Sequence, residues 1–245
     1  MDALIFAAGL GTRLGALGQA EPKALLEVGG VTMLERTVRR LAAAGADRVV
    51  VNVHHQADQI ERFLAEHDLG VEVLISREEE RPLETGGGLL HARALFRRDR
   101  PILLHNVDVI TDADLGAMVE THHRSRALAT LAVNGRESSR ALLFDQAGLF
   151  GREDRRDGVR REEGRSPRGE VRAWAFAGIH VCSAELLDLI TERDVFSIVT
   201  TYLRLAGEGR VILPWVLSSG LWLEIGSLER LEAARAALDA AGGQK

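Results

Sequence analysis

The first chemical feature of the chain is a glycine turn that carries a threonine and an arginine, Gly9-Leu10-Gly11-Thr12-Arg13. The turn directly follows an apolar, strand-like run, Ala3–Ala8, and ligands of open α/β sheets bind at the carboxyl ends of such strands. Glycines let the backbone turn sharply and present amide N–H groups to an anion. The motif is neither a Walker loop nor a dinucleotide fingerprint, because Leu14 stands at the third glycine position. The turn therefore predicts contact with phosphate.

Lysine is almost absent from the chain. Of its 31 lysine and arginine residues only two are lysines, Lys23 and the last residue, Lys245. Lys23 follows Pro22 and lies ten residues beyond Arg13. An ammonium is a compact point charge that fits against one phosphate oxygen, whereas a planar guanidinium needs more room. We therefore interpret Lys23 as a phosphate ligand; the alternative is a codon bias toward arginine that spared one lysine.

The elements that position these residues follow from the apolar pattern of the first half. Runs of strand length alternate with helical spacing, which is typical of βαβ units around a mainly parallel sheet. The strands expected are Ala3–Ala8, Arg48–Val53, Val71–Ser76, Pro101–Asn106 and Ala127–Val133. The helices expected between them are Met33–Ala44, Gln56–His67, Thr85–Phe96 and Asp112–Ser125. The fold class predicted is α/β, a doubly wound, Rossmann-like and mainly parallel mixed sheet.

The second half of the chain completes one domain that spans residues 1–245. Strand patterns are seen at Ala141–Asp145, Val171–Cys182, Val211–Val216 and Leu221–Ile225. Helical patterns are seen at Ala184–Thr191, Ile198–Gly207 and Ser227–Ala241. Between them, residues 151–169 hold seven arginines, five acids and almost no apolar residues. This segment is expected to be a solvated, mobile insertion, either a plain surface loop or a lid that meets a phosphorylated substrate.

Composition excludes several classes of protein. A net charge of -5 argues against a nucleic-acid-binding surface. No apolar run approaches the roughly 18 to 20 residues of a membrane span, and the start lacks the basic region of a signal peptide, so we expect a cytoplasmic protein that binds no membrane. The single cysteine, Cys182, lies in an apolar run and is expected to be a small buried residue. The histidine pairs His54-His55 and His122-His123 are interpreted as structural, because adjacent side chains point in different directions.

Six segments, in order along the chain, resemble those of sugar-1-phosphate nucleotidylyltransferases. The signature of that family begins GxGTRL and continues PKxLxxV, here Gly9–Leu14 and Pro22–Val28. Leu83–Gly88 resembles the glycine segment that lies beneath the nucleobase in that family. Its form is close to that of the small bacterial enzymes that uridylylate N-acetylmuramic acid 1-phosphate. The other matches are His105–Asp108 with the metal aspartate, Ala177–Val181 at the sugar pocket, and Trp222–Ser227 with a second metal carboxylate.

The resemblance implies an Mg²⁺-dependent enzyme that transfers a nucleotidyl group from UTP or GTP to a sugar 1-phosphate and releases pyrophosphate, for nucleotide-sugar and cell-envelope synthesis. Asp108 and Glu224 would hold Mg²⁺, and Arg13, Lys23 and Asp108 would be catalytic. The expected nucleotide contacts are Ala8, Gly9, Gly11, Thr12, Arg13, Lys23, Thr85, Gly86 and Asn106, and the expected substrate contacts are Arg140 and Gly178. An aspartate such as Asp108 at a strand end also serves simply to cap a turn.

The chain departs from the family pattern at four places. Val107 replaces a glycine, Glu224 replaces an aspartate, and Phe176 replaces an asparagine. The family's EKP segment, whose lysine meets the sugar phosphate, has no lysine here, so Arg140 or Arg152 would supply that contact. These departures leave two alternatives open: a cytidylyltransferase that acts on an alcohol phosphate such as phosphocholine, and a non-catalytic regulatory protein that binds nucleotide sugars. The sequence does not decide the oligomeric state.

Overall fold

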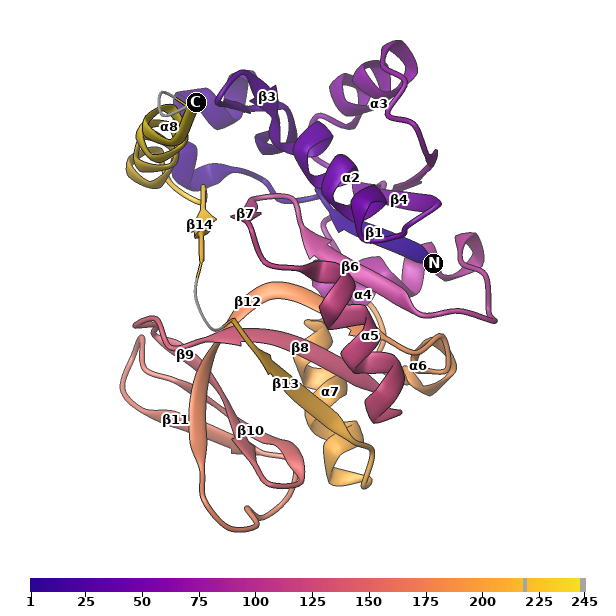
Figure 1. Ribbon diagram of the computed structural model, residues 1–245, viewed down its shortest axis with the longest axis vertical. Helices are drawn as coiled ribbons and strands as arrows, with labels where there is room; N and C mark the ends of the chain where they lie inside the picture. Colours follow the sequence, from indigo (N-terminus) through magenta and orange to yellow (C-terminus); the bar gives the residue numbers. More distant parts are fainter. Residues whose placement is uncertain (218–219, 243–245) are drawn as a thin grey trace.

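The computed structural model describes residues 1–217 and 220–242, and Lys245 lies outside them. Its centre is a mixed sheet in the strand order β11-β10-β9-β12-β6-β1-β4-β5, to which β8 and β13 are added beside β12. Strands β5, β4, β1 and β6 run parallel to one another. Strand β12 pairs antiparallel with β6, β8 and β9 and joins this parallel half to the rest. Figure 1 shows β1, β4 and β6 of the parallel half in the upper part of the molecule, and β8, β9, β10, β11 and β13 in the lower part.

The strands are β1 (Asp2–Phe6), β2 (Glu27–Val28), β3 (Val31–Thr32), β4 (Arg48–Val53), β5 (Glu72–Arg77), β6 (Ile102–Asn106), β7 (Val109–Thr111), β8 (Ala129–Asn134), β9 (Arg140–Asp145), β10 (Gly148–Asp154), β11 (Arg160–Glu163), β12 (Arg172–Cys182), β13 (Ile212–Val216) and β14 (Trp222–Glu224). The α-helices are α1 (Ala16–Ala20), α2 (Met33–Ala43), α3 (Ala57–Glu66), α4 (Glu84–His91), α5 (Leu115–Ser125), α6 (Leu186–Leu189), α7 (Ile198–Gly207) and α8 (Leu228–Gly242). Short 3₁₀ turns, η1 to η3, cover Thr12–Leu14, Lys23–Leu25 and Ala92–Leu95.

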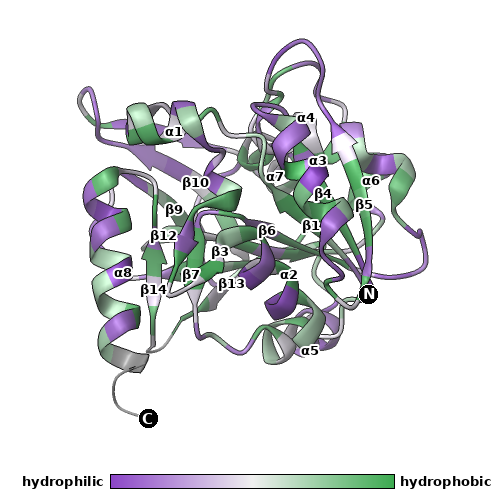
Figure 2. Ribbon diagram, turned by 90° about the horizontal axis from the view of Figure 1, so that it is seen from above, coloured by the Kyte–Doolittle hydropathy of each residue, from purple (hydrophilic) through white to green (hydrophobic). Residues whose placement is uncertain are grey.

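Two hydrophobic cores lie on opposite faces of the sheet, and alternate residues of β1 point into them because side chains alternate along a strand. Ala3 and Ile5 pack in the core that includes residues of α2, α3, α5 and α8. Leu4 packs in the core that includes residues of α4, α6 and α7. Figure 2 shows the hydrophobic colouring concentrated in the central strands. The doubly wound α/β class predicted from the sequence is therefore confirmed.

Some expected element bounds change in the structure. The helix expected over Ala184–Thr191 is only the short turn Leu186–Leu189. The expected strand Val171–Cys182 is present, but its register with β8 shifts between Phe176 and His180, where Gly178 has φ +77°. Because a positive φ favours glycine, Gly178 marks an irregularity that residue patterns alone did not reveal.

The charged segment 151–169 contains strand structure that we had not assigned. Its first part forms the β10–β11 hairpin, which pairs antiparallel with β9. Its second part is anchored, since Arg165 donates to both Asp145 carboxylate oxygens at 2.7 and 2.8 Å and only 14% of the Arg165 side chain is exposed. Glycine is required at Gly164, where an added Cβ would lie 2.0 Å from the Leu203 carbonyl oxygen of α7. Residues 155–164 and 166–169 are exposed, whereas 151–154 and Arg165 are not, and the mobility of the segment stays a prediction.

Candidate active site

The glycine turn folds as its sequence suggests. Gly11 has φ +63°, a left-handed conformation that glycine adopts without strain, and the Leu14 N–H donates to the Gly11 carbonyl at 2.9 Å. A second glycine, Gly18 of α1, packs so closely that an added Cβ would lie 2.4 Å from the Gly11 oxygen. This packing fixes the turn and leaves Thr12 and Arg13 exposed at its tip, where both can reach a bound anion.

Lys23 points into the same edge of the sheet and meets a predicted metal ligand. Its Nζ donates to Asp108 Oδ2 at 2.9 Å, and the two side chains are 14% and 18% exposed. Lys23 begins the turn η2, and Asp108 follows β6, whose neighbour in the sheet is β1. The fold therefore joins two residues that are 85 positions apart. A half-sheltered ion pair of this kind holds its ammonium in place more firmly than an exposed pair does.

The two predicted metal carboxylates lie on adjacent backbone segments. Strand β14 pairs antiparallel with β7, with Glu224 opposite Val109, and the Ile225 N–H donates to the Asp108 carbonyl at 2.9 Å. Their approach at the edge of the sheet, despite the long separation in sequence, is thus confirmed for the backbone. Both side chains offer carboxylate oxygens, the ligands that Mg²⁺ prefers, so the residues present fit the ion.

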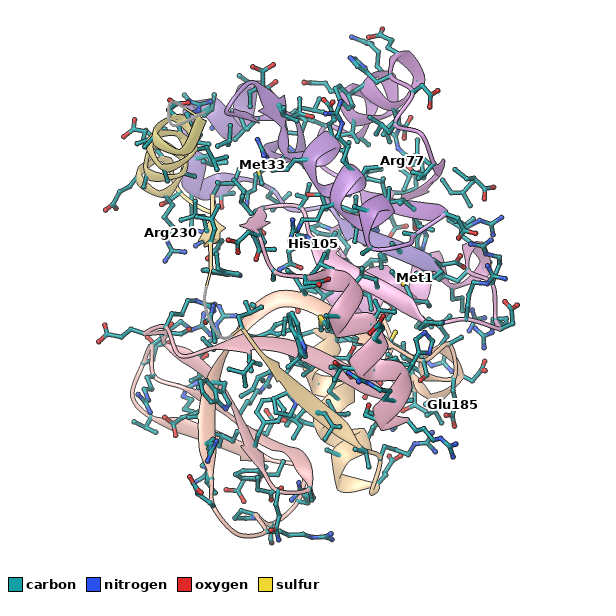
Figure 3. All side chains as sticks on the ribbon, in the orientation of Figure 1. Met1, Met33, Arg77, His105, Glu185 and Arg230 are labelled. Atoms are coloured by element: carbon teal, nitrogen blue, oxygen red, sulfur yellow. The ribbon has the colours of Figure 1, made fainter. Side chains whose placement is uncertain are left out.

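Each carboxylate is balanced by cations. Glu224 lies 3.6 Å from an Arg13 nitrogen and accepts a hydrogen bond from Arg230 at 2.5 Å. Sequence analysis missed Arg230, which comes from the first turn of α8 and lies beside β14 in Figure 3. The only available signal was its place six residues after Glu224, at the start of a helix that must pack near the strand.

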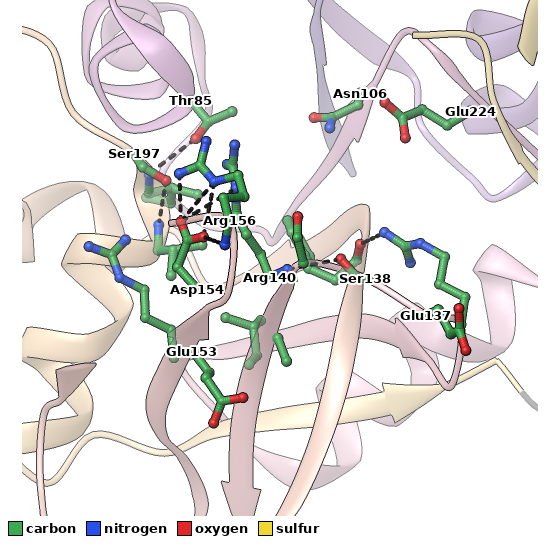
Figure 4. Close-up of a pocket in the computed structure, with 18 of the residues that line it drawn as sticks. Thr85, Asn106, Glu137, Ser138, Arg140, Glu153, Asp154, Arg156, Ser197 and Glu224 are labelled. Atoms are coloured by element: carbon green, nitrogen blue, oxygen red, sulfur yellow. Dashed lines mark hydrogen bonds and ion pairs between the residues drawn. The ribbon is translucent and has the colours of Figure 1, made fainter. Parts of the chain in front are cut away.

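A cavity of about 1030 Å³ opens beside these groups. Arg13, Asn106 and Glu224 line one part of it, and Arg140 lines another, as Figure 4 shows for the last three. Gly178 packs closely against Asn106, because an added Cβ there would lie 2.8 Å from the Asn106 amide nitrogen. Of the expected catalytic and acceptor residues, Arg13 and Arg140 therefore line this cavity, whereas Lys23, Asp108 and Gly178 are not among its lining residues.

The glycine segment of α4 is held by the loop before α7. Thr85 lines the cavity, and its hydroxyl accepts from the Ile198 N–H at 3.1 Å. Gly86 is buried, and its N–H donates to the Phe196 carbonyl at 2.9 Å. A Cβ at Gly86 would lie 2.3 Å from the Phe196 ring, so only glycine allows this packing. Nucleotide contacts from Ala8, Thr85 and Gly86 stay predictions.

Arg136 is a second residue that sequence analysis missed. Its guanidinium carbon lies 4.0 Å from the centre of the Trp222 ring, and it donates to Asn134 Oδ1 at 2.7 Å and the Phe176 carbonyl at 2.8 Å. Burial lowers the pKa of Arg136, and the nearby Glu224 opposes that shift. Arg136 therefore braces Trp222, two residues before the carboxylate of β14, with a cation–π contact.

The histidines and the cysteine that the sequence analysis interpreted as structural make contacts inside the protein or are buried. His54 Nδ1 lies 2.8 Å from the Glu78 carbonyl oxygen. The ring of His122 is hydrogen-bonded to Thr130 at 3.0 Å, and burial lowers its pKa to about 4. Cys182 is fully buried, as expected, and burial raises the pKa of its thiol.

Among residues 1–217 and 220–242, no helix is long and apolar enough to cross a membrane.

Arg13, on the glycine turn, lies near the carboxylate of Glu224, and Lys23, on the turn η2, pairs with Asp108. This arrangement suits enzymes that transfer nucleotidyl groups, because that chemistry needs phosphates positioned and their charge neutralised. Comparison with known families agrees: the chain belongs to the family of the MobA-like NTP transferase domain, whose model matches residues 3–240. It is a nucleotidyltransferase.

Two curated relatives and one solved structure are similar to this chain. The chain is 34% identical over 242 residues to N-acetylmuramate alpha-1-phosphate uridylyltransferase of Caulobacter vibrioides, covering 96% of each chain. It is 29% identical to mannose-1-phosphate guanylyltransferase 1 of Arabidopsis thaliana, covering 92% of this chain but 61% of that protein. Among solved structures, the UTP-bound UGPase of Acinetobacter baumannii has a TM-score of 0.75 at 18% identity, covering 97% of this chain and 92% of the other. The last likeness concerns the fold alone.

Proposed function

We propose that this protein transfers a nucleotidyl group from UTP or GTP to a sugar 1-phosphate, giving a nucleoside diphosphate sugar and pyrophosphate. One observation carries the proposal: Lys23 and Asp108 pair at 2.9 Å on the edge of the sheet where Glu224 and Arg13 also meet. The relatives that act on sugar 1-phosphates, uridylyl and guanylyl transferases among them, support the substrate class.

In the proposed reaction an oxygen of the sugar phosphate attacks the α-phosphorus of the triphosphate. One phosphorus–oxygen bond forms, and the bond from the α-phosphorus to the pyrophosphate leaving group breaks. No general base is needed, because the attacking phosphate is already an anion. Lys23 would hold oxygens of the α-phosphate, and Arg13 would bind the departing pyrophosphate with its planar fork. The N–H groups of the glycine turn would hold the remaining phosphate oxygens.

Asp108 and Glu224 would hold Mg²⁺ in this proposal. A bound Mg²⁺ supplies charge neutralisation on the phosphate oxygens. Lys23 and Arg13 balance the two carboxylates in the structure described, which supports a role for both cations beside the phosphates. We also propose that the reaction takes place in the cytoplasm, where nucleoside triphosphates are made.

Pyrophosphate release tests the proposal directly. The protein is incubated with Mg²⁺, each of the four common ribonucleoside triphosphates, and glucose, mannose, N-acetylglucosamine or N-acetylmuramic acid 1-phosphate. We expect release with UTP or GTP that requires the sugar phosphate. Release with CTP and phosphocholine alone would favour the cytidylyltransferase alternative. No release with any pair, while an NDP-sugar still binds by calorimetry, would make the protein a regulatory binding protein.

A further inference from the structure

A half-buried arginine, Arg136, follows strand β8 and has only neutral partners. Its guanidinium lies over the Trp222 ring and donates to Asn134 Oδ1 at 2.7 Å and to the Phe176 carbonyl at 2.8 Å. In the part of the chain that the structure describes, Arg136 forms no ion pair with a carboxylate. A sheltered cation without such a partner is unfavourable, so this site is suited to an anion.

The charges around Arg136 point the same way. Burial lowers the pKa of Arg136, Glu224 opposes that shift, and the charge of Arg230 adds to it. Glu224 is itself shared by two other arginines, Arg13 at 3.6 Å and Arg230 at 2.5 Å. Guanidiniums from three separate segments therefore gather around one carboxylate, and this excess of positive charge attracts an anion.

The order of the strands separates Arg136 from the glycine turn. Strand β8 runs parallel to β6, because both pair antiparallel with β12. Arg136 therefore lies at the same carboxyl edge as the turn after β1, but β6 and β12 stand between β1 and β8. At about 4.8 Å per strand, the two strand ends are roughly 14 Å apart. Asp108, which follows β6, lies between them, and Arg13 and Arg136 line one cavity from its two sides.

This arrangement matches the geometry that the proposed reaction needs. In a direct displacement the attacking and leaving oxygens lie on opposite sides of the phosphorus, and Arg13 is on the side proposed for the pyrophosphate. We propose that Arg136 binds the phosphate of the acceptor and holds its attacking oxygen toward the α-phosphorus. This inference rests on the proposed function and adds the residue that recognises the acceptor phosphate. The planar guanidinium fork matches two phosphate oxygens, and the stacking on Trp222 fixes its plane.

The two arginines that the sequence suggested for this contact are engaged on the hairpin sheet. Arg152 pairs with Glu162 at 2.5 Å. Arg140 lies 3.9 Å from Asp154, and its side chain is 68% exposed. Arg136 differs from both, because its neighbours hold the guanidinium in place without neutralising its charge.

Steady-state kinetics of Arg136→Gln test the inference, with whichever sugar 1-phosphate supports pyrophosphate release. We expect the KM for the sugar 1-phosphate to rise about 10- to 100-fold, the effect of one or two charged hydrogen bonds, while the KM for the triphosphate stays near the wild-type value. Arg136→Lys should lie between the two proteins, because it keeps the charge but loses the fork, and it replaces the glutamine variant if that variant does not fold. The matched control is Arg172→Gln, an exposed arginine of β12 that pairs with Glu170 and does not line the cavity; it should keep both KM values.

Equilibrium binding separates phosphate recognition from simple bracing of Trp222. The acceptor phosphate becomes the β-phosphate of the NDP-sugar, and a nucleoside monophosphate lacks it. By calorimetry, Arg136→Gln should therefore weaken the binding of UDP-glucose or GDP-mannose about 10- to 100-fold and leave the binding of UMP or GMP unchanged. If Arg136 only braced Trp222, the variant would change both affinities equally or change neither.

Four results would overturn the inference. Unchanged acceptor KM and unchanged NDP-sugar affinity in Arg136→Gln, with normal turnover, would reject it and leave the proposed function intact. A raised KM for the triphosphate alone would assign Arg136 to the triphosphate. A rise in acceptor KM in Arg140→Gln or Arg152→Gln, but not in Arg136→Gln, would move the contact to the hairpin sheet. No pyrophosphate release with any pair of substrates, together with no binding of an NDP-sugar, would reject the proposed function and this inference together.

Discussion

The ion pairs at the catalytic edge differ in kind from those on the hairpin. Lys23 and Asp108 are separated by 85 positions and are sheltered by the fold. On the hairpin, Arg152 pairs with Glu162 over 10 positions and Arg156 with Asp154 over two, and these side chains are 30 to 53% exposed. Catalytic pairing thus needs the whole sheet, whereas the hairpin pairs need only a local turn. Exposed local pairs contribute little stability, and a ligand can replace them at low cost.

Replacing Asp108 should have the largest effect on turnover. Asp108→Asn keeps the shape of the side chain but removes the charge that faces Lys23 and would hold Mg²⁺, and a loss on the order of 10³-fold is expected, as for preorganised charge in other active sites. Glu224→Asp keeps a carboxylate and should retain activity within roughly tenfold, with a changed Mg²⁺ optimum. Pyrophosphate release measured against Mg²⁺ concentration separates the two. Nearly normal activity of Asp108→Asn would show that Asp108 only caps a turn.

Lys23→Arg should fail almost as badly as Lys23→Ala. The Lys23 side chain is only 14% exposed, with its Nζ 2.9 Å from Asp108, so a guanidinium keeps the charge but loses the point-like geometry. We expect turnover to fall on the order of 10²-fold or more. The matched control is Arg172→Lys, which should turn over like the wild type. If the arginine variant keeps its turnover, the survival of this lysine is a matter of codon use.

The sequence pointed to the proposed catalytic edge through signals that are local to strand ends, and the roles of its residues stay predictions. Gly11 lies in a turn after β1, Asp108 follows β6, and the end of a parallel strand is where such residues meet. The approach of Asp108 to Glu224 needed the family order of the segments, since nothing in the apolar pattern reveals that β14 pairs with β7. Which atoms bind the nucleotide is still a prediction.

The β10–β11 hairpin could not be predicted, for a physical reason. Strand recognition depends on apolar alternation and β-branched residues, and Arg160–Glu163 has neither. Its pairing is held by backbone hydrogen bonds and by cross-strand charge pairs such as Arg152 with Glu162. A rule based on composition assigns such a highly charged sequence to disorder. Arg136 was missed similarly, because a cation over Trp222 requires a contact between two strand ends.

The ion pair of Asp145 with Arg165, at the base of the hairpin, is buried, unlike the exposed pairs of the hairpin. The Asp145→Asn variant should show how much more this pair contributes to the free energy of unfolding. The Asp145 side chain is fully buried and bonds Arg165 through both oxygens. Removing one partner of a sheltered pair leaves an uncompensated charge, so we expect unfolding to become easier by about 3 kcal/mol. Urea unfolding measures this. Asp99→Asn, at an exposed pair with Arg100, should unfold like the wild type, and equal results for both would remove the contrast.

The pH dependence of this pair has a definite sign. Arg165 holds the pKa of Asp145 well below its ordinary value, which is about 3.9 in an unfolded chain. A lowered folded-state pKa gives stability that is present above the unfolded pKa and is lost as the pH falls through the folded one. The stability difference between wild type and Asp145→Asn should therefore be constant from about pH 5 to 8 and shrink below about pH 4. A difference that grew in acid would contradict the assignment.

The smallest expected effect concerns the hairpin tip and sharpens the contrast with its base. The exposed pairs of residues 155–162 hold little structure, so subtilisin should cut there in the free protein, whereas the base held by Asp145 should resist. If the segment 151–169 is a lid, a saturating NDP-sugar should slow cleavage about five- to tenfold by lowering the open population. Equal cleavage rates with and without the NDP-sugar would leave the hairpin a plain surface element, with its arginines paired only to their neighbours.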